Sequence, residues 1–250
     1  LKKQNLPALI LKGTVLLPNN DLKIDLEKTS VKEVLDEAEF FHDNNILIVN
    51  EINNLEEQIN LNNLTKIGVI AKVTHKIEIP NNKIRFELSG IKRVYVKEYL
   101  NINNNLETIV EELNETLEEK DKEIVYVEKL KRELNEYIKE IPYASNSILN
   151  PIKDINDLGV LTDIIAPYIT IDLTKLNEYL CELDIKKRFI KLLQDINDEI
   201  NNFQIDVEIE KEIQREIDKS QKEYILREKV KVIKKELGEE SLKEEEIQNL

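Results

Sequence analysis

Apolar and polar residues alternate through much of the first ~110 positions, a pattern typical of β-strands. Residues 21–26 alternate strictly, as do residues 84–88. Residues 66–79 form a long β-branched stretch, and the Pro-Asn-Asn sequence after it predicts a hairpin with the strand that follows. Further strands are predicted at residues 6–11, 46–49 and 91–99, the last of them starting after Ser89-Gly90.

One predicted helix interrupts these strands. Ser30 and Glu33 have the spacing of a capping box, in which each side chain satisfies a free backbone amide. The apolar residues that follow share one helical face: Val31, Val34, Leu35, Ala38 and Phe41. A helix between the early strands of a mixed sheet predicts an α+β fold, as a small barrel or sandwich.

The pattern changes across residues 106–123, where acidic residues cluster and the apolar period becomes helical. An apolar stripe over residues 127–141 predicts a helix that ends at Pro142. Three more are predicted: residues 158–165 ending at Pro167, one from Leu173 or Thr174, and one capped by Asp184 with a stripe to Ile200. Together they predict a compact helical bundle.

Residues 201–237 contain no Pro or Gly, which allows one helix of roughly 50 Å at 1.5 Å per residue. Its apolar stripe is thin and its other faces are charged, so we expect a strut or coiled-coil arm. We expect Gly238 to end this helix and the capping box Ser241–Glu244 to open another. The predicted domains are residues 1–115, β-rich; 116–200, a helical bundle; and 201–250, the long helical arm.

Composition excludes several functions. The net charge of −14 argues against nucleic acid and anionic membrane as partners. The five glycines are too scattered for a phosphate-binding loop, and one cysteine with two histidines makes a poor zinc site. No apolar run approaches the ~20 residues that span a bilayer, and the start lacks a signal-peptide pattern. We therefore expect an intracellular protein, and a piece of a longer chain.

Candidate chemistry is sparse. His42, His75 and Cys181 are simplest to interpret as structural residues, with Cys181 a buried thiol, and no catalytic motif occurs. We therefore predict no catalytic, metal or cofactor-binding residue. Apolar side chains near the hairpin instead suggest a patch for unfolded polypeptide, unless they form the ordinary core face of a sheet: Ile77, Ile79, Pro80, Ile84, Tyr95 and Tyr99.

Two sets of residues resemble the amino-terminal region of Lon, the ATP-dependent protease. Residues 217–228 read I-D-K-S-Q-K-E-Y-I-L-R-E and continue to I-K-K-E-L-G-E at residues 233–239, close to that family's K-S-Q-x-E-Y-x-L-x-E-Q-x-x-x-I-x-x-E-L-G pattern. Lys229 replaces a common Gln. The opening, L-P-A-L-I-L-K-G, is similar to the family's L-P-L-L-P-L-R, and G-V-I-A, P-N-N and S-G-I-K-R follow in the family's order.

The resemblance implies a PUA-like β domain, then a helical bundle and a long extended helix. An ATPase module with ATP and Mg and a Ser-Lys dyad protease domain would come later in the parent chain, so no catalytic residue is carried over. It also implies a hexamer, which in this family is found in the bacterial cytoplasm or in mitochondria, and we expect the bacterial cytoplasm for this chain. This region would select unfolded, damaged and degron-bearing substrates. The long helix would pair with other Lon subunits, through residues that include Tyr224, Leu226, Arg227 and Val230.

Three other functions stay open at this point. The chain is compatible with a stand-alone Lon-domain adaptor that presents ligands without a protease attached. PUA-like folds can bind RNA, although the acidic balance and the lack of an aromatic and basic platform argue against it. A purely structural coiled-coil spacer does not explain why a third of the chain is predicted to be β.

Overall fold

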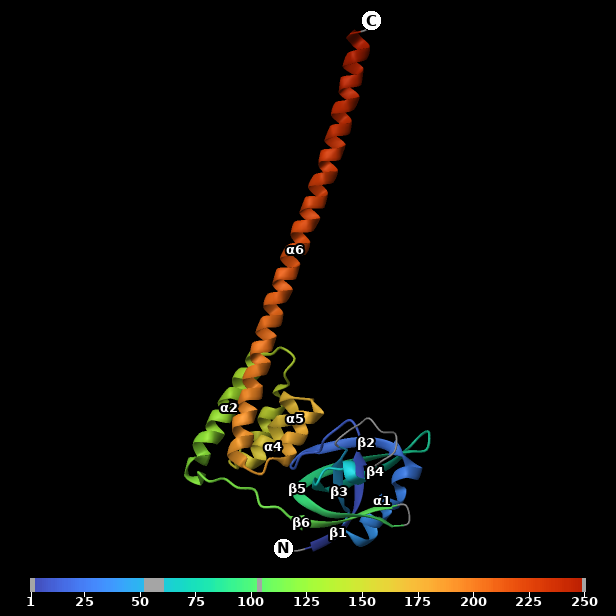
Figure 1. The fold of residues 1–250 in the computed structure, drawn as a ribbon, viewed down its shortest axis with the longest axis vertical. Coiled ribbons are helices and arrows are strands. Elements are labelled where there is room, and N and C mark those ends of the chain that lie inside the picture. The colour runs from blue at the N-terminus through green and yellow to red at the C-terminus, as the bar shows by residue number, and fades with distance from the viewer. Residues whose placement is uncertain (1–2, 52–60, 103–104, 249–250) are drawn as a thin grey trace. The chain divides into compact units, whose positions relative to one another are not determined.

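The computed structural model describes residues 3–51, 61–102 and 105–248 (Figure 1). The chain forms two compact units, Leu1–Asp198 and Glu199–Leu250. Strands come first and helices follow, which confirms the predicted α+β class. The predicted three-domain division, with boundaries after residues 115 and 200, stays a prediction.

The strands of the first unit form a closed barrel. They are β1 (Lys3–Leu11), β2 (Asp21–Glu27), β3 (Asn45–Asn50), β4 (Ile67–Ile79), β5 (Lys83–Ile102) and β6 (Asn105–Glu112). They lie in the order β2-β5-β4-β3-β1-β6, and β6 also pairs with β5, which closes the sheet. Strand β1 is parallel to β3, with Ala8 opposite Leu47. Alternating small aliphatic side chains fill the interior: Leu6, Ala8, Leu47, Val49, Ile70, Val94, Val96 and Val110.

Helix α1 (Lys28–Phe41) packs on β1 and β3 through Val31, Val34, Leu35 and Ala38. The predicted capping box is wrong, because Glu27 is the N-cap and Ser30 lies inside the first turn. There the Ser30 hydroxyl donates to the Glu27 carbonyl oxygen at 2.8 Å. Phe41 is predicted to lie on the apolar stripe, but the helix ends there and its ring is exposed.

Strand β5 corrects a prediction, because the sequence pattern indicates one strand before Ser89-Gly90 and another after it. The two are one strand, which pairs with β2, β4 and β6. The register shifts in β5 opposite Ile70/Ala71 and between Val96 and Glu98 are β-bulges, which bend a strand. The bent strand can therefore pair with β4 on one edge and with β2 and β6 on the other. The sequence pattern did not predict strand β6. Its glutamates, such as Glu107 and Glu111 on the outward face, were assigned to an acidic domain boundary, so the alternation of Leu106 and Val110 on the inward face was not recognised as a strand.

After α1, the helices that lie wholly within the first unit are α2 (Glu123–Glu140), α3 (Leu149–Ile152), α4 (Leu158–Ile169) and α5 (Leu173–Cys181), with 3-10 turns at Leu61–Asn63, Lys120–Lys122 and Asn146–Ile148. The predicted helix before Pro142 is confirmed, and so is the start at Leu173, where the Asp172 carboxylate accepts from two backbone amides. Pro167 does not end its helix: it lies inside α4, near the C-terminus.

Helix α6 (Ile185–Gln248) begins in the first unit and continues through the second. The predicted cap at Asp184 is confirmed, with its Oδ1 accepting from the backbone N–H of Lys186 at 2.9 Å. The predicted breaks near residue 200 and at Gly238 are wrong, and the Ser241 capping box falls within the helix. Gly238 does not adopt the positive φ of a helix C-cap, so it costs some stability without ending the helix.

Candidate functional site

The structure places the predicted hairpin residues in different environments. Ile77 is 60% exposed near the tip of the β4–β5 hairpin, Pro80 in the turn is exposed and Ile79 is half-buried. Ile84 is 3% exposed and lies opposite Leu26 of β2, so its side chain belongs to the core. An exposed patch that includes Ile84 is therefore wrong, whereas Ile77 and Pro80 remain accessible.

Tyr95 and Tyr99 do not share a face, although their spacing in a regular strand predicts it. The bulge between Val96 and Glu98 inserts one residue and reverses the alternation. Tyr95 is consequently exposed, while Tyr99 packs against the barrel interior and donates its hydroxyl to the Thr65 carbonyl oxygen at 2.5 Å. Burial raises the pKa of Tyr99 far above its usual value. Tyr99 is therefore a structural residue.

Two adjacent aromatic rings are far more exposed than the predicted patch. Phe40 is 74% and Phe41 79% exposed, with ring centroids 6.5 Å apart. Ion pairs place them beside the hairpin, because Lys76 Nζ lies 2.8 Å from Glu39 Oε2. The last turn of α1 and the hairpin tip thus present apolar side chains on neighbouring elements. The sequence signal was two consecutive aromatics at the end of a helix, where only one of them fits the apolar stripe.

The other candidates have no catalytic arrangement. His75 Nδ1 lies 2.9 Å from Glu87 Oε2 at the surface, and His42 Nε2 lies 3.9 Å from Glu37 Oε1. Cys181 is exposed, which corrects the prediction that it is buried: it is the last residue of α5 and does not share the burial of Leu180 before it. Within the described ranges, no group of three or more acidic, His or Cys side chains is arranged to hold a metal ion.

A buried ion cluster joins the barrel to the helices. Arg93 of β5 donates to both carboxylate oxygens of Asp163 in α4, at 2.5 and 2.6 Å, and each of these side chains is 2% exposed. Its guanidinium also donates to the carbonyl oxygens of Tyr179 and Leu180 near the end of α5, at 3.0 and 2.9 Å. A cation at the carbonyl end of a helix is favourable, so Arg93 fixes α5 against the barrel.

Arg188 of α6 completes this cluster. Its side chain is fully buried and donates to Glu115, which also accepts from Arg93 at 2.9 Å. At the edge of the bundle, Lys122, Lys186 and Tyr126 donate to Glu119, and these bonds lower the pKa of Glu119 to about 2. The sequence suggested none of these pairs, since Arg93 and Asp163 lie far apart along the chain.

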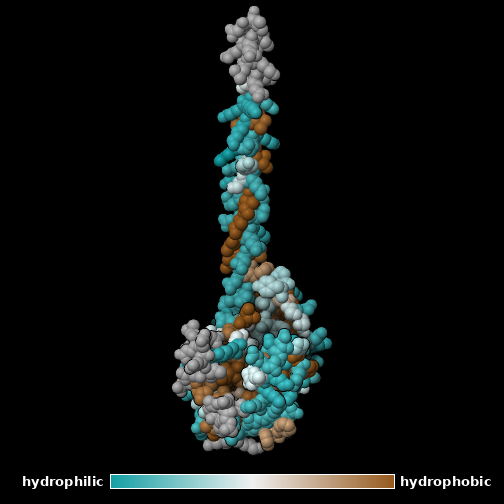
Figure 2. Space-filling model, turned by 90° about the vertical axis from the view of Figure 1, so that its right-hand side faces the viewer, coloured by the Kyte–Doolittle hydropathy of each residue, from teal (hydrophilic) through white to brown (hydrophobic). Residues whose placement is uncertain are grey.

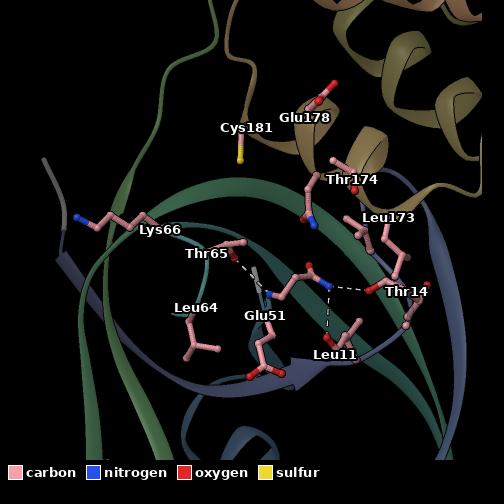
Figure 3. Close-up of a pocket in the computed structure, with 14 residues that line it drawn as sticks. Leu11, Thr14, Glu51, Leu64, Thr65, Lys66, Leu173, Thr174, Glu178 and Cys181 are labelled. Carbon is pink, nitrogen blue, oxygen red and sulfur yellow. Dashed lines mark hydrogen bonds between the residues drawn. The ribbon is translucent and has the colours of Figure 1, made fainter. Parts of the chain in front are cut away.

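A pocket of about 710 Å³ opens between the mouth of the barrel and α5 (Figure 3). The last residues of β1 and β3, with the residues that follow each of them and those just before β4, form one wall, through Leu11, Gly13, Thr14, Val15, Asn50, Glu51, Leu64, Thr65 and Lys66. Helix α5 forms the other, through Leu173, Thr174, Asn177, Glu178 and Cys181. In the close-up the Cys181 sulfur points toward the barrel wall. No sequence pattern predicted this pocket, because its walls come from four separate segments.

In the second unit, α6 carries a discontinuous apolar stripe, drawn brown in Figure 2. The four residues predicted for assembly are exposed: Tyr224 66%, Leu226 52%, Val230 49%, and the Arg227 side chain 79%. Ile209, Ile213 and Ile217 extend the stripe toward the start of the helix, and each is about half exposed. Among the described residues no helix is long and apolar enough to cross a membrane.

Comparison with known proteins identifies the family. The sequence profile of the ATP-dependent protease La (Lon) substrate-binding domain matches residues 5–198. The chain belongs to this family. The Lon protease of Brevibacillus choshinensis is 28% identical over 248 residues, which are 99% of this chain and 32% of that protein. Lon protease 1 of Bacillus subtilis strain 168 is 26% identical over 248 residues, again 99% of this chain and 32% of the relative.

Solved structures of Lon domains share the fold. The N-terminal domain of the Mycobacterium avium complex Lon protease superposes with a TM-score of 0.64 at 19% identity, covering 78% of this chain and 99% of that one. A Lon N-terminal domain protein from Xanthomonas campestris gives 0.50 at 15% identity, covering 76% and 98%. The chain spans about a third of the length of its curated Lon relatives.

Proposed function

We propose that this chain is the substrate-recognition and assembly region of a bacterial, cytoplasmic ATP-dependent Lon protease that degrades misfolded, damaged and degron-bearing proteins. The observation that carries the proposal is the family match over residues 5–198. In the parent protein, the other two thirds would supply the ATPase module with ATP and Mg and the Ser-Lys dyad protease. The chain's own role is to bind unfolded polypeptide and hold it for that machinery.

The exposed apolar surface of the β barrel supports this role. Unfolded segments differ from folded proteins in presenting apolar side chains, which Phe40, Phe41 and Ile77 can cover. Two rings and one aliphatic side chain bury little area, so each contact is weak and releases its substrate easily. If each subunit of an oligomer presents the same surface, one unfolded chain can bind several copies at once, which raises the effective affinity without strengthening any single contact.

Replacing Phe40 and Phe41 together by Ser is expected to weaken binding of a permanently unfolded protein about fivefold or more. The rings are exposed, so the fold does not depend on them. Fluorescence anisotropy with a fluorescein-labelled, reduced and carboxymethylated protein measures the affinity. The matched control replaces Ile124 and Val125 by Ser, since this adjacent apolar pair is 68% and 62% exposed on α2 of the bundle. Equal losses in both variants would rule out a barrel-specific surface.

Assembly is proposed to use the apolar stripe of α6. A half-exposed aliphatic row on a long charged helix is typical of a helix that pairs with another. Leu226→Glu with Val230→Glu is expected to lower the average mass in light scattering across a concentration series, because it places charge in the paired face. The control adds the same charge at Asn201 and Asn202, which are exposed and polar. A mass that does not depend on concentration in the unmodified chain would contradict pairing.

A further inference from the structure

The pocket at the barrel mouth is chemically incomplete. The side chain of Asn50, at the end of β3, donates from Nδ2 to the carbonyl oxygens of Thr14 at 2.6 Å and Leu11 at 3.5 Å (dashed in Figure 3). These bonds fix the amide orientation, because a flipped amide would bring Oδ1 against two other oxygens. Asn50 Oδ1 is therefore an acceptor with a defined position, and Asn50 is 4% exposed.

Asn50 Oδ1 is buried and receives no hydrogen bond from the described residues. The same holds for Oδ1 of Asn177 on the α5 wall. A buried amide oxygen without a donor costs free energy, and native structures usually satisfy such groups. Both carboxylate oxygens of Glu51, another lining residue, are likewise buried without a hydrogen bond from the described residues, although Oε2 lies 3.7 Å from Lys12 Nζ. Four such acceptor atoms on three lining residues of one pocket therefore favour a ligand that brings N–H donors.

The rest of the lining fixes the remaining chemistry. Leu11, Val15, Leu64 and Leu173 make most of the pocket apolar, and Thr65, Thr174 and Glu178 add oxygen atoms. A volume of about 710 Å³ at the mouth of a barrel is within the usual range of ligand sites. The pocket therefore suits a ligand with an apolar body and an N–H group beside it, which is what an aliphatic or aromatic residue of an extended polypeptide provides.

We propose that this pocket is a second, specific polypeptide site, which takes one apolar side chain of an unfolded segment while a backbone N–H of that segment donates to Asn177 or Asn50. This inference rests on the proposed function, since it names where part of the substrate binds. It differs from the surface of Phe40 and Phe41 in being concave and able to select. Arg93, which is ion-paired with Asp163, positions the α5 wall by donating to the carbonyl oxygens of Leu180 and Tyr179.

The single cysteine of the chain gives a direct test, because Cys181 is exposed on the pocket wall. The surrounding protein partly desolvates the thiol and raises its pKa, so alkylation is done at mildly alkaline pH. Modification with a bulky aryl maleimide is expected to weaken binding of the unfolded, fluorescein-labelled protein about fivefold or more. Conversely, a saturating amount of the unlabelled unfolded protein is expected to slow the alkylation of Cys181 by a similar factor.

Cys181→Ser treated with the same reagent is the control, and it is expected to keep the original affinity. A second variant does not depend on labelling: Asn177→Leu removes one acceptor at nearly constant size and is expected to weaken binding, while Asn135→Leu on the exposed face of α2 is not. Thermal unfolding of each form establishes that it is folded.

The outcomes separate the two proposals. If blocking Cys181 and replacing Asn177 leave the affinity unchanged while the Phe40 and Phe41 variant loses it, the pocket is not a polypeptide site and the proposed function stands. If the unmodified chain does not bind the unfolded protein at all, both proposals fail. Loss of affinity on blocking, together with protection of Cys181 by the bound protein, supports the pocket.

Discussion

Asp163→Ala is expected to lower the free energy of unfolding by about 3–5 kcal/mol, because it leaves buried cations without their partner. Arg93 donates to both oxygens of this carboxylate, and Arg188 Nη1 lies 3.7 Å from one of them. Both guanidinium groups are almost fully buried, so water cannot replace the lost acceptor. Glu115 alone would then serve two arginines.

Urea unfolding followed by circular dichroism measures this loss. The control is Asp25→Ala, which breaks the Arg85 ion pair on the barrel surface, where the Arg85 Nη2 to Asp25 Oδ2 distance is 2.7 Å. Solvent can hydrate both of those groups, so the unfolding midpoint should hardly move. A double variant, Arg93→Met with Asp163→Leu, is expected to be less destabilised than Asp163→Ala. Equal midpoints for Asp163→Ala and the unmodified chain would show that the cluster contributes little.

Gly90→Ala is expected to destabilise the barrel by about 1–3 kcal/mol, because no space exists for the added methyl group. A Cβ at Gly90 would lie 2.6 Å from the Leu17 carbonyl oxygen and 3.3 Å from Pro18 Cα. Both atoms belong to the backbone, so neither can turn away as a side chain would. Hydrogen bonds hold the same segment, with Asn19 N–H donating to the Gly90 carbonyl at 2.8 Å.

Gly238→Ala is the matched control and should have the opposite effect. Nothing lies within 4 Å of an added Cβ there, and the residue is inside α6. Ala is better than Gly in a helix by about 1 kcal/mol, so the helical signal of the second unit should persist to higher temperature. A stable Gly90→Ala protein would mean that the segment around Leu17 moves aside at little cost.

Local signals predicted the elements that depend on nearby residues. Strict alternation located β2, and Asp184 located the start of α6, since a cap involves residues only two or three positions apart. The resemblance over residues 217–228 predicted the family from the amino-acid sequence alone. Periodicity did not predict the bounds of strands that are set by pairing with distant strands. Strand β5 continues through Ser89-Gly90 because β2, β4 and β6 all pair with it.

The candidate sites were predictable only in part. Ile77 was expected at the surface and lies there. Ile84 was expected there too, but it is the first apolar residue of the alternating segment 84–88, whose apolar side chains face the core. One inserted residue after Val96 separated Tyr95 from Tyr99, and no sequence pattern marks that bulge. The pocket combines separate strand ends with one face of α5, so its existence depends on the long-range bonds of Arg93. Contacts between residues so far apart in the sequence produce no periodic pattern of apolar and polar residues from which they could be predicted.

The pairing of β1 with β6 has a consequence for synthesis on the ribosome. Lys3 lies opposite Glu111 and Leu6 opposite Thr108, so one edge of the first strand has no partner until the chain has grown past residue 112. Contacts between such distant positions form slowly, and an open strand edge invites pairing with other nascent chains. A protein that we propose to capture unfolded polypeptides must therefore itself pass through a vulnerable interval before its own barrel closes.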